Sequence, residues 1–258
     1  MKQRELPISF VLSASLLILF IILPLIFTLL SSSLTELLKT VSDQEVAASI
    51  GRTFLAAAMA TFIGLLIGLP TAYILARKKF RGKSLISGLI DLPLIVPHTA
   101  AGIALLITFG RQGWLGSLFA RLGFFFADTL PGVVLAMTFV SLPLLANGAR
   151  EAFAAVDPEL ERVARVDGAS PLQVFCKIAL PIAWKGVLSA ALMMWARGIS
   201  EFGAISILAY HPKTVSVLLF ERFQGFGLGA ALPVTVLLLF IVLVLFVCLR
   251  VLSDKMGD

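Results

Sequence analysis

Six long apolar runs constrain this chain more than any other feature of its sequence. A helix needs about 20 mainly apolar residues to cross the hydrocarbon core of a bilayer. The strands of a membrane barrel would alternate apolar and polar residues with a period of two, and these runs do not. We therefore expect an all-α membrane protein with six transmembrane helices. The expected spans are residues 6–30, 53–76, 85–109, 132–146, 187–210 and 230–249.

Two of these runs differ from a typical membrane-spanning helix, one in its length and proline content and one in its position at the N-terminus. The run 132–146 is the weakest, because it is short and Pro143 interrupts it. Proline is tolerated in a membrane helix when neighbouring groups satisfy the freed carbonyl. The first run is too long for the core of a signal peptide, and no small-x-small cleavage pattern follows it. We expect it to be retained, as part of one membrane domain over residues 1–258.

The charged residues indicate an orientation for these helices. Hydrophobic residues make up 59% of the chain and charged residues 14%, with a net charge of +6. Most of the 21 Lys and Arg residues fall between spans on the side of the N-terminus. Basic residues favour the cytoplasmic side of a membrane, so we expect both termini in the cytoplasm. The same residues lie near anionic headgroups, and we expect no nucleic-acid partner.

Groups that would support catalysis or cofactor binding are missing from the sequence. Gly82-Lys83-Ser84 resembles the end of a phosphate-binding loop, but Arg77 stands where the loop needs its first glycine. The two histidines, His98 and His211, belong to no zinc-binding pattern, and the two cysteines indicate neither a disulfide framework nor a metal site. We expect no catalytic residue, cofactor or metal on this chain, and no enzymatic activity. Energy from ATP would have to come from a partner.

The longest inner loop, residues 150–184, has the pattern of two short helices. Asp157 and Pro158 are a good cap and first-turn residue, and apolar residues then recur at helical spacing. Gly168 is expected to end this helix, and Ser170-Pro171 to begin a second one. The alternative is an ordinary surface loop. We favour two amphipathic helices bent at Gly168, because about 35 patterned residues exceed what a connection needs.

Ionisable residues inside the spans are candidates for a transport pathway, because burying them in lipid is costly. The fifth span carries Arg197, Ser200 and Glu201. Arg197 and Glu201 are one helical turn apart, so they can form an internal ion pair with a purely structural role. The functional alternative is that this polar face lines the pathway.

The third span carries a second set of candidates. Asp91 lies near its inner end, and Pro97, His98 and Thr99 lie deeper. Prolines free backbone carbonyls, and broken helices at membrane depth usually line a cavity. The structural alternatives place Asp91 at the inner interface and make His98 an ordinary packing residue.

The inner loop also resembles a known family. Gly168, Ile178, Leu180 and Pro181 match the coupling loop of ABC importer permeases, E-A-A-x3-G-x9-I-x-L-P. The chain departs from that pattern at its start, where Arg162-Val163-Ala164 replaces Glu-Ala-Ala and the acidic residue is shifted to Glu161 or absent. Longer stretches resemble archaeal-type molybdate/tungstate permeases. These are residues 72–78, 91–99, 196–204, 209–214 and 221–223, of which 200–204 is shared with sulfate permeases.

This resemblance implies a type I importer fold, with a coupling helix between the fourth and fifth spans. It implies a cell-membrane permease for molybdate or tungstate that forms a homodimer and is driven by two separate ATPase subunits, which would bind ATP and Mg²⁺. An extracytoplasmic oxyanion-binding protein would deliver the cargo. The residues expected to couple the permease to the ATPase are Glu161, Arg165, Gly168, Ala169 and Ser170.

Three alternatives stay open at this point. The first is an ABC permease for another oxyanion, such as sulfate, thiosulfate or phosphate. The second is a secondary transporter or channel that works without ATP. The third, an enzyme embedded in the membrane, is disfavoured because the catalytic groups are missing.

Overall fold

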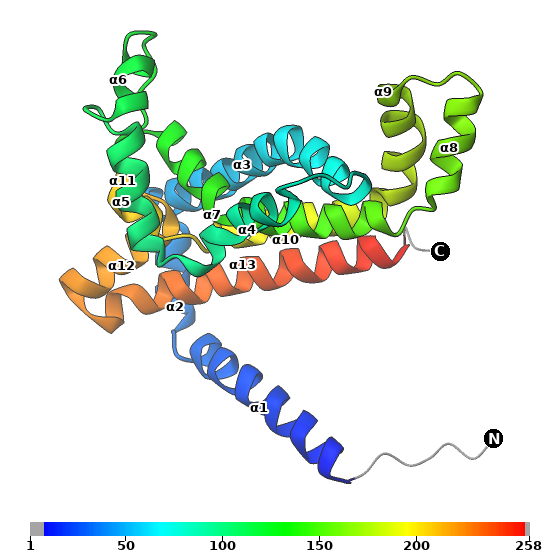
Figure 1. Cartoon of the computed structure of the whole chain (residues 1–258). Coiled ribbons are helices and arrows are strands. Elements are labelled where there is room, and N and C mark those ends of the chain that lie inside the picture. The colour runs from blue at the N-terminus through cyan, green and yellow to red at the C-terminus, as the bar shows by residue number, and fades with distance from the viewer. Residues whose placement is uncertain (1–7, 256–258) are drawn as a thin grey trace. The chain divides into compact units, whose positions relative to one another are not determined.

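The computed structural model describes residues 8–255, and its regular elements over that range are all helical. The elements are α1 (Ile8–Leu30), α2 (Leu34–Val41), α3 (Gln44–Arg77), α4 (Lys83–Ile95), α5 (His98–Phe109), α6 (Trp114–Ala120), α7 (Leu130–Ala154), α8 (Pro158–Val166), α9 (Pro171–Val174), the π-helix η1 (Phe175–Ala179), α10 (Leu180–Ile199), α11 (Gly203–Leu208), α12 (Val215–Phe226) and α13 (Leu228–Lys255) (Figure 1). They divide into two compact units. One unit contains the residues up to Ile50 and those from Leu218 on, and the other contains Gly51–Val217.

The first unit is built from the two terminal spans and the short helix α2. Helix α13 packs against both α1 and α2. A reciprocal cap begins α2: the Glu36 backbone N–H donates to Ser33 Oγ at 3.3 Å, and the Ser33 N–H donates to Glu36 Oε2 at 2.9 Å. Beyond α2, Arg222 Nη2 lies 2.6 Å from Asp43 Oδ2. The expected first span is confirmed from Ile8 to Leu30, and residues 6 and 7 lie outside the described residues.

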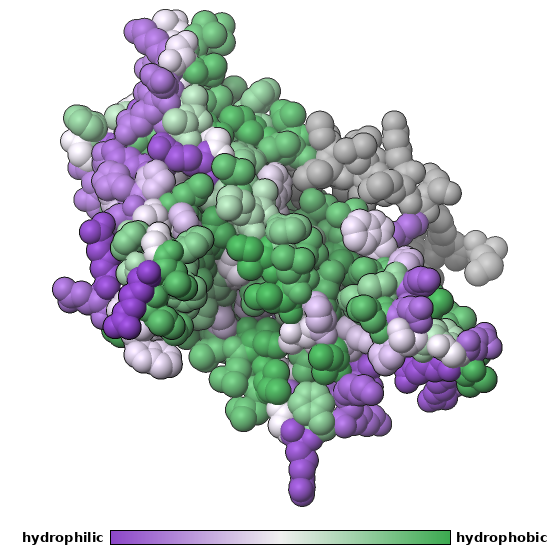
Figure 2. Space-filling view, turned by 90° about the horizontal axis from the view of Figure 1, so that it is seen from above, coloured by the Kyte–Doolittle hydropathy of each residue, from purple (hydrophilic) through white to green (hydrophobic). Residues whose placement is uncertain are grey.

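Apolar side chains cover much of the protein surface. Helix α1 has no buried residue within its unit, and Phe20, for example, is 80% exposed. Figure 2 shows hydrophobic side chains over the middle of one face, with hydrophilic ones gathered towards its margins. Exposing so much apolar surface to water is unfavourable, whereas contact with lipid tails is not. These side chains therefore identify a membrane protein.

The second unit is organised around α3, α7 and α10. Ala57 of α3 and Met137 of α7 belong to one buried cluster, whereas Leu69 of α3 and Phe153 of α7 belong to another. The two helices are therefore parallel, with their C-terminal ends on the same side. Helix α10 packs along α7 in the opposite direction, because its early residues join the second cluster and its last residue, Ile199, joins the first.

The third span is broken into two helices, as its prolines indicate. Helices α4 and α5 are bent by 112° at the break between Ile95 and His98. The cause is Pro97, which has no N–H to donate and disfavours helical backbone in the residue before it. Val96 is accordingly extended, with φ −68° and ψ 132°. The expected span 85–109 is therefore present as two helices, and the break lies at one of the prolines that the sequence singles out.

This bent pair nevertheless carries the chain from one side of the second unit to the other. Asp91 of α4 contacts Asn147 in the C-terminal half of α7. Leu105 of α5 packs with Val133 near the start of α7. The chain thus returns from the Arg77 end of α3 to the beginning of α7. Helices α4 and α5 together form one broken span, and the expected number of six spans is confirmed.

The fourth and fifth spans differ from expectation. Pro143 lies inside α7 without interrupting it, and the helix runs for 25 residues with most of its surface packed against neighbours. The expected fifth span, 187–210, was wrong at both ends. Helix α10 begins at Leu180, continuous with α9 and η1, and ends at Ile199. The helix ends there, and the Glu201 carboxylate accepts the Ala204 backbone N–H in the first turn of the separate helix α11.

Candidate functional site

The hairpin between α7 and α10 has the bend that the sequence predicts. Asp157 caps α8 by accepting the Glu159 backbone N–H at 2.9 Å. At the other end the Ala169 N–H donates to Ala164 O at 2.9 Å, and the Gly168 N–H donates to Arg165 O at 3.1 Å. These two bonds form a Schellman motif, which needs a left-handed residue at its turn. Gly168 supplies it with φ +88°.

The second half of the hairpin is continuous with the fifth span. The Gln173 N–H donates to Ser170 Oγ at 3.3 Å, and the Ser170 N–H donates to Gln173 Oε1 at 2.8 Å, so the predicted helix start is confirmed. From Pro171 to Ile199 the chain forms one helix of 29 residues with a π-helical stretch inside it. The second amphipathic segment is therefore the beginning of a span, and the bend is followed directly by the helix that contains α10.

A buried carboxylate holds α8 against the end of α3. Glu161 is 1% exposed. Its Oε1 accepts a hydrogen bond from Arg77 Nε at 2.7 Å, and its Oε2 accepts one from the Tyr73 hydroxyl at 2.7 Å. Arg165 Nη2, one turn further along α8, lies 3.3 Å from the same Oε2. We call these four residues the Glu161 cluster. A carboxylate satisfied in this way is a firm attachment point.

Arg77 extends this attachment to a third element. Its Nη2 donates to the Val156 carbonyl oxygen at 2.8 Å, just beyond the end of α7. The ring of Tyr73 packs edge-on against Phe153 and Phe175, with centroids 5.4 and 5.0 Å away. The hairpin is thus joined to both α3 and α7 at its base. Towards its tip, Arg165, Gly168 and Ser170 are exposed and Ala169 is half-buried.

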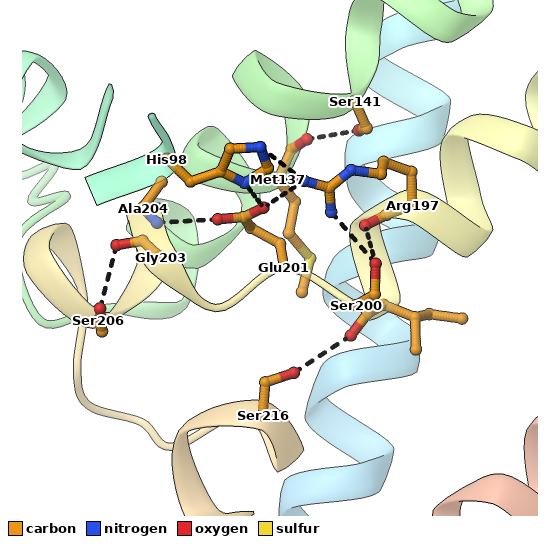
Figure 3. A network of polar contacts seen from close by, with 11 residues as sticks. His98, Met137, Ser141, Arg197, Ser200, Glu201, Gly203, Ala204, Ser206 and Ser216 are labelled. Atoms are coloured by element: carbon orange, nitrogen blue, oxygen red, sulfur yellow. Dashed lines mark hydrogen bonds and ion pairs between the residues drawn. The ribbon is translucent and has the colours of Figure 1, made fainter. Parts of the chain in front are cut away.

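A second buried carboxylate lies where α10 ends, and Figure 3 shows its surroundings. Glu201 is 1% exposed. Its Oε1 accepts the Ala204 backbone N–H at 2.8 Å, and its Oε2 lies 3.0 Å from Arg197 Nη2 and 2.7 Å from His98 Nδ1. Arg197 Nη1 donates to Ser200 Oγ at 3.1 Å. We call Glu201, Arg197, His98 and Ser200 the Glu201 cluster. The predicted ion pair between Arg197 and Glu201 is confirmed.

The cluster joins the two broken spans of the second unit. His98 is the first residue of α5, and Glu201 lies between α10 and α11. The elements approach so closely that a Cβ on Gly203 would lie 2.7 Å from His98 Cβ. His98 Nδ1 is also 2.8 Å from Arg197 Nη2. A single ring nitrogen cannot donate to the carboxylate and accept from the guanidinium at once, so its proton determines which contact is a hydrogen bond.

The other predicted pathway residues lie outside this network. Asp91 is half-buried, and its Oδ1 accepts a hydrogen bond from Asn147 Nδ2 at 2.5 Å. Pro97 and Thr99 are exposed at the break of the third span. Sequence reasoning did not single out Tyr73 and Arg77 as members of a site, although their spacing of four places both on one face at the C-terminal end of α3. No group of His, Cys, Asp or Glu that could hold a metal ion occurs among the described residues.

Comparisons with known proteins agree with this architecture. Residues 64–257 match the family model described as the inner membrane component of binding-protein-dependent transport systems. The chain is 45% identical over 243 residues to the molybdate/tungstate transport system permease protein WtpB of Pyrococcus abyssi, covering 93% of each chain. It is 34% identical over 244 residues to a probable sulfate transport system permease protein of Chlorokybus atmophyticus, covering 91% of this chain and 85% of that one.

A solved structure supports the same fold. The chain shares 16% identity and a TM-score of 0.72 with a chain of the bacterial alginate ABC transporter in complex with an alginate pentasaccharide-bound periplasmic protein. The match covers 97% of this chain and 94% of the other. Together with the broken spans and the hairpin bent at Gly168, these similarities show that the chain belongs to the family of binding-protein-dependent transport system inner membrane components.

Proposed function

We propose that this chain is the permease subunit of an ABC importer for molybdate and tungstate, and that it forms the translocation pathway. The observation that carries the proposal is the hairpin bent at Gly168 and attached at its base by Glu161. The similarity to the molybdate/tungstate permease of Pyrococcus abyssi over nearly the whole chain supports the choice of cargo.

The hairpin has the properties of a docking element for a separate ATPase. Its exposed tip carries small and polar residues, among them Gly168 and Ser170, which fit a cleft without steric conflict. Its base is joined to α3 and α7 and continues into α10, so movement of the tip is passed to three spans. In this proposal Arg165, Gly168, Ala169 and Ser170 face the ATPase, whereas Glu161 acts from inside as the attachment of α8.

The proposed assembly has two copies of this chain and two ATPase subunits, which bind ATP and Mg²⁺. The excess of basic residues on the side of the N-terminus supports a cytoplasmic location for the hairpin and both termini. A loaded extracytoplasmic binding protein delivers the oxyanion from the other side, as the similar alginate transporter was solved with a periplasmic protein. ATP binding draws the two hairpins together and opens the pathway to the outside. ATP hydrolysis then returns the pathway to the inward-open state. The loaded binding protein and ATP thus bias the same two-state equilibrium from opposite faces.

Uptake by a reconstituted transporter tests this proposal. The chain is placed in lipid vesicles with its ATPase and binding protein, and uptake of labelled molybdate, tungstate and sulfate is measured with and without ATP. We expect ATP-dependent uptake of molybdate and tungstate. Flux that proceeds at full rate without an ATPase would instead identify a secondary transporter or channel.

Sulfate is the second candidate cargo. The observation that favours it is the 34% identity to a probable sulfate permease, together with the run Ser200-Glu201-Phe202-Gly203-Ala204, which resembles that of sulfate permeases. The three labelled oxyanions separate the candidates, because sulfate uptake above molybdate and tungstate uptake would reverse the assignment. Binding of each oxyanion to the purified extracytoplasmic protein provides an independent measurement of the same preference.

A further inference from the structure

The guanidinium of Arg197 has one side turned to Glu201 and His98 and one side turned to the exposed hydroxyl of Ser200. Its Nη2 contacts Glu201 and His98, whereas its Nη1 donates to Ser200 Oγ at 3.1 Å (Figure 3). The Arg197 side chain is 25% exposed, and Ser200 is exposed. The Glu201 carboxylate is 1% exposed, so an anion arriving from outside the fold can reach the guanidinium, which always carries a positive charge, but not its counter-anion.

Glu201 does not depend on Arg197 alone for its position. The Ala204 N–H donates to Oε1 at 2.8 Å, and His98 Nδ1 lies 2.7 Å from Oε2, where it donates in the tautomer that carries its proton on this nitrogen. Removing the partner of a buried charge is normally costly, because the charge is left without compensation. Here two donors stay on the carboxylate when the guanidinium turns away, so the cost of that movement is reduced.

We propose that Arg197 and Ser200 form a transient contact site for the transported oxyanion, and that Glu201 is the internal counter-anion with which the cargo competes. This inference rests on the proposed function and deepens it by naming the side chains that would hold the cargo. Guanidinium groups suit oxyanions because their N–H groups match two oxygens at once, and the Ser200 hydroxyl can donate to a third.

Competition between the cargo and Glu201 for the Arg197 guanidinium explains why a pathway would contain a buried carboxylate beside its cation. A guanidinium without a counter-charge would hold a dianion tightly, and a cargo that binds tightly leaves slowly. With Glu201 in place, the charges of Arg197 and Glu201 cancel. The oxyanion must then displace an existing partner, so its binding is weak and its release fast.

A purely structural ion pair makes the opposite prediction. If the cluster only fixes the break between α10 and α11, neutralising Glu201 loosens the fold and weakens any anion binding. In the proposed site the same change frees Arg197 and strengthens anion binding. The sign of the effect therefore separates the two roles.

The experiment is equilibrium binding of labelled molybdate, tungstate and sulfate to the purified chain in lipid nanodiscs, without ATPase or binding protein. We expect Glu201→Gln to bind the oxyanion about tenfold more tightly than the wild type, the size of one charge-assisted hydrogen bond. The glutamine oxygen can still accept the Ala204 N–H. Arg197→Gln is expected to abolish binding, and Ser200→Ala, a milder change at an exposed side chain, to weaken it severalfold.

Two variants serve as controls. Glu201→Asp keeps the negative charge, so it is expected not to tighten binding. Glu161→Gln makes the same chemical change in the buried carboxylate of the Glu161 cluster, and it is expected to leave anion binding at the wild-type level. Thermal unfolding of each variant shows that it is folded.

Several results would overturn the inference. These are binding in Glu201→Gln that is no tighter than in the wild type, undiminished binding in Arg197→Gln, or no binding by any folded variant. Failure of the proposed function looks different. In that case uptake of molybdate and tungstate is missing in the reconstituted transporter, while the order of anion binding among the variants still holds for sulfate or another oxyanion.

Discussion

The Glu161 and Glu201 clusters use the same chemistry for different purposes. Each has a carboxylate that is 1% exposed and an arginine four residues away on the same chain segment. In the Glu161 cluster Arg77 and Tyr73, at 2.7 Å each, make the shortest contacts with the carboxylate, and Arg77 is 11% exposed, whereas the more distant Arg165 is 51% exposed. In the Glu201 cluster the cation and the imidazole are 25% and 34% exposed and adjoin two broken spans. The difference indicates a mechanical joint in one place and an accessible site in the other.

The largest expected difference between the clusters is in stability. Glu161→Ala leaves Arg77 buried without its counter-charge and the Tyr73 hydroxyl without its acceptor, so we expect a loss of about 3 kcal/mol. Glu201→Ala leaves Arg197 25% exposed and still bonded to Ser200, so its charge is better compensated than that of Arg77. We therefore expect a loss of roughly 1–2 kcal/mol. Thermal unfolding of both purified variants in the same detergent measures the difference. Equal losses would contradict the distinction between joint and site.

Substitutions at Gly168 separate the attachment of the hairpin from its docking. A Cβ at this position would meet nothing within 4 Å, so the cost of any side chain comes from the backbone at φ +88°. Both Gly168→Ala and Gly168→Glu should lose about 1–2 kcal/mol of stability. Only Gly168→Glu adds a bulky charge to the docking tip, and we expect it to abolish ATP-driven uptake while membrane insertion stays normal.

Gly168→Ala is the matched control for this experiment, and it should keep a large part of the uptake. Uptake by Gly168→Glu at the level of Gly168→Ala would show that the tip does not enter a cleft. Loss of uptake in both variants to the same extent would assign the effect to the bend itself.

The hairpin could be predicted from sequence because its signals are local. A cap residue, a glycine at the turn and a second cap act over a few residues, and the structure places them as expected. The prolines of the third span indicated a break there, but its angle and the end of the fifth span were harder to predict. Composition reports only that residues 85–109 and 187–210 are apolar enough, whereas the helices end where Pro97 disrupts the backbone and where Glu201 finds partners on another element.

The members of the two clusters could be predicted only in part. Arg197 and Glu201 are one turn apart, so their pairing follows from helix geometry. The contact of Glu201 with His98 joins residues 103 positions apart, and that of Glu161 with Tyr73 joins residues 88 positions apart. Such pairs depend on how the spans pack together, which a single sequence without a structure does not specify.

A single hydrogen bond tests how much redundancy the joint contains. Tyr73→Phe removes the hydroxyl that donates to Glu161 but keeps the ring that packs against Phe153 and Phe175. Arg77 and Arg165 still compensate the carboxylate, so we expect a loss of about 1 kcal/mol and nearly normal uptake. The measurements are thermal unfolding and reconstituted uptake. A loss as large as that of Glu161→Ala would show that the hydroxyl, rather than the arginine, is the main attachment.

An ion pair in the other unit gives a reference for a carboxylate that is only partly buried. Arg222 Nη2 donates to Asp43 Oδ2 at 2.6 Å, and this hydrogen bond is the main reason that the pKa of Asp43 lies below its usual value of 3.8. The Asp43 side chain is 34% exposed, so water weakens the interaction. Asp43→Asn keeps the Oδ1 oxygen that accepts the backbone N–H groups of Glu45 and Val46. The substitution therefore isolates the charge, and we expect it to cost less than about 1 kcal/mol at neutral pH.

The pH dependence of that difference is the sharpest form of the prediction. A carboxyl group whose pKa is lowered by folding adds stability above its unfolded pKa, and this stability is lost as the pH falls through the folded pKa. The stability difference between wild type and Asp43→Asn should thus be constant near neutral pH and shrink below pH 3.8. Unfolding of both proteins across a pH series measures it. A difference that stays undiminished in acid would mean that Asp43 contributes through the shape of its side chain rather than its charge, which would remove it as a reference for the two buried clusters.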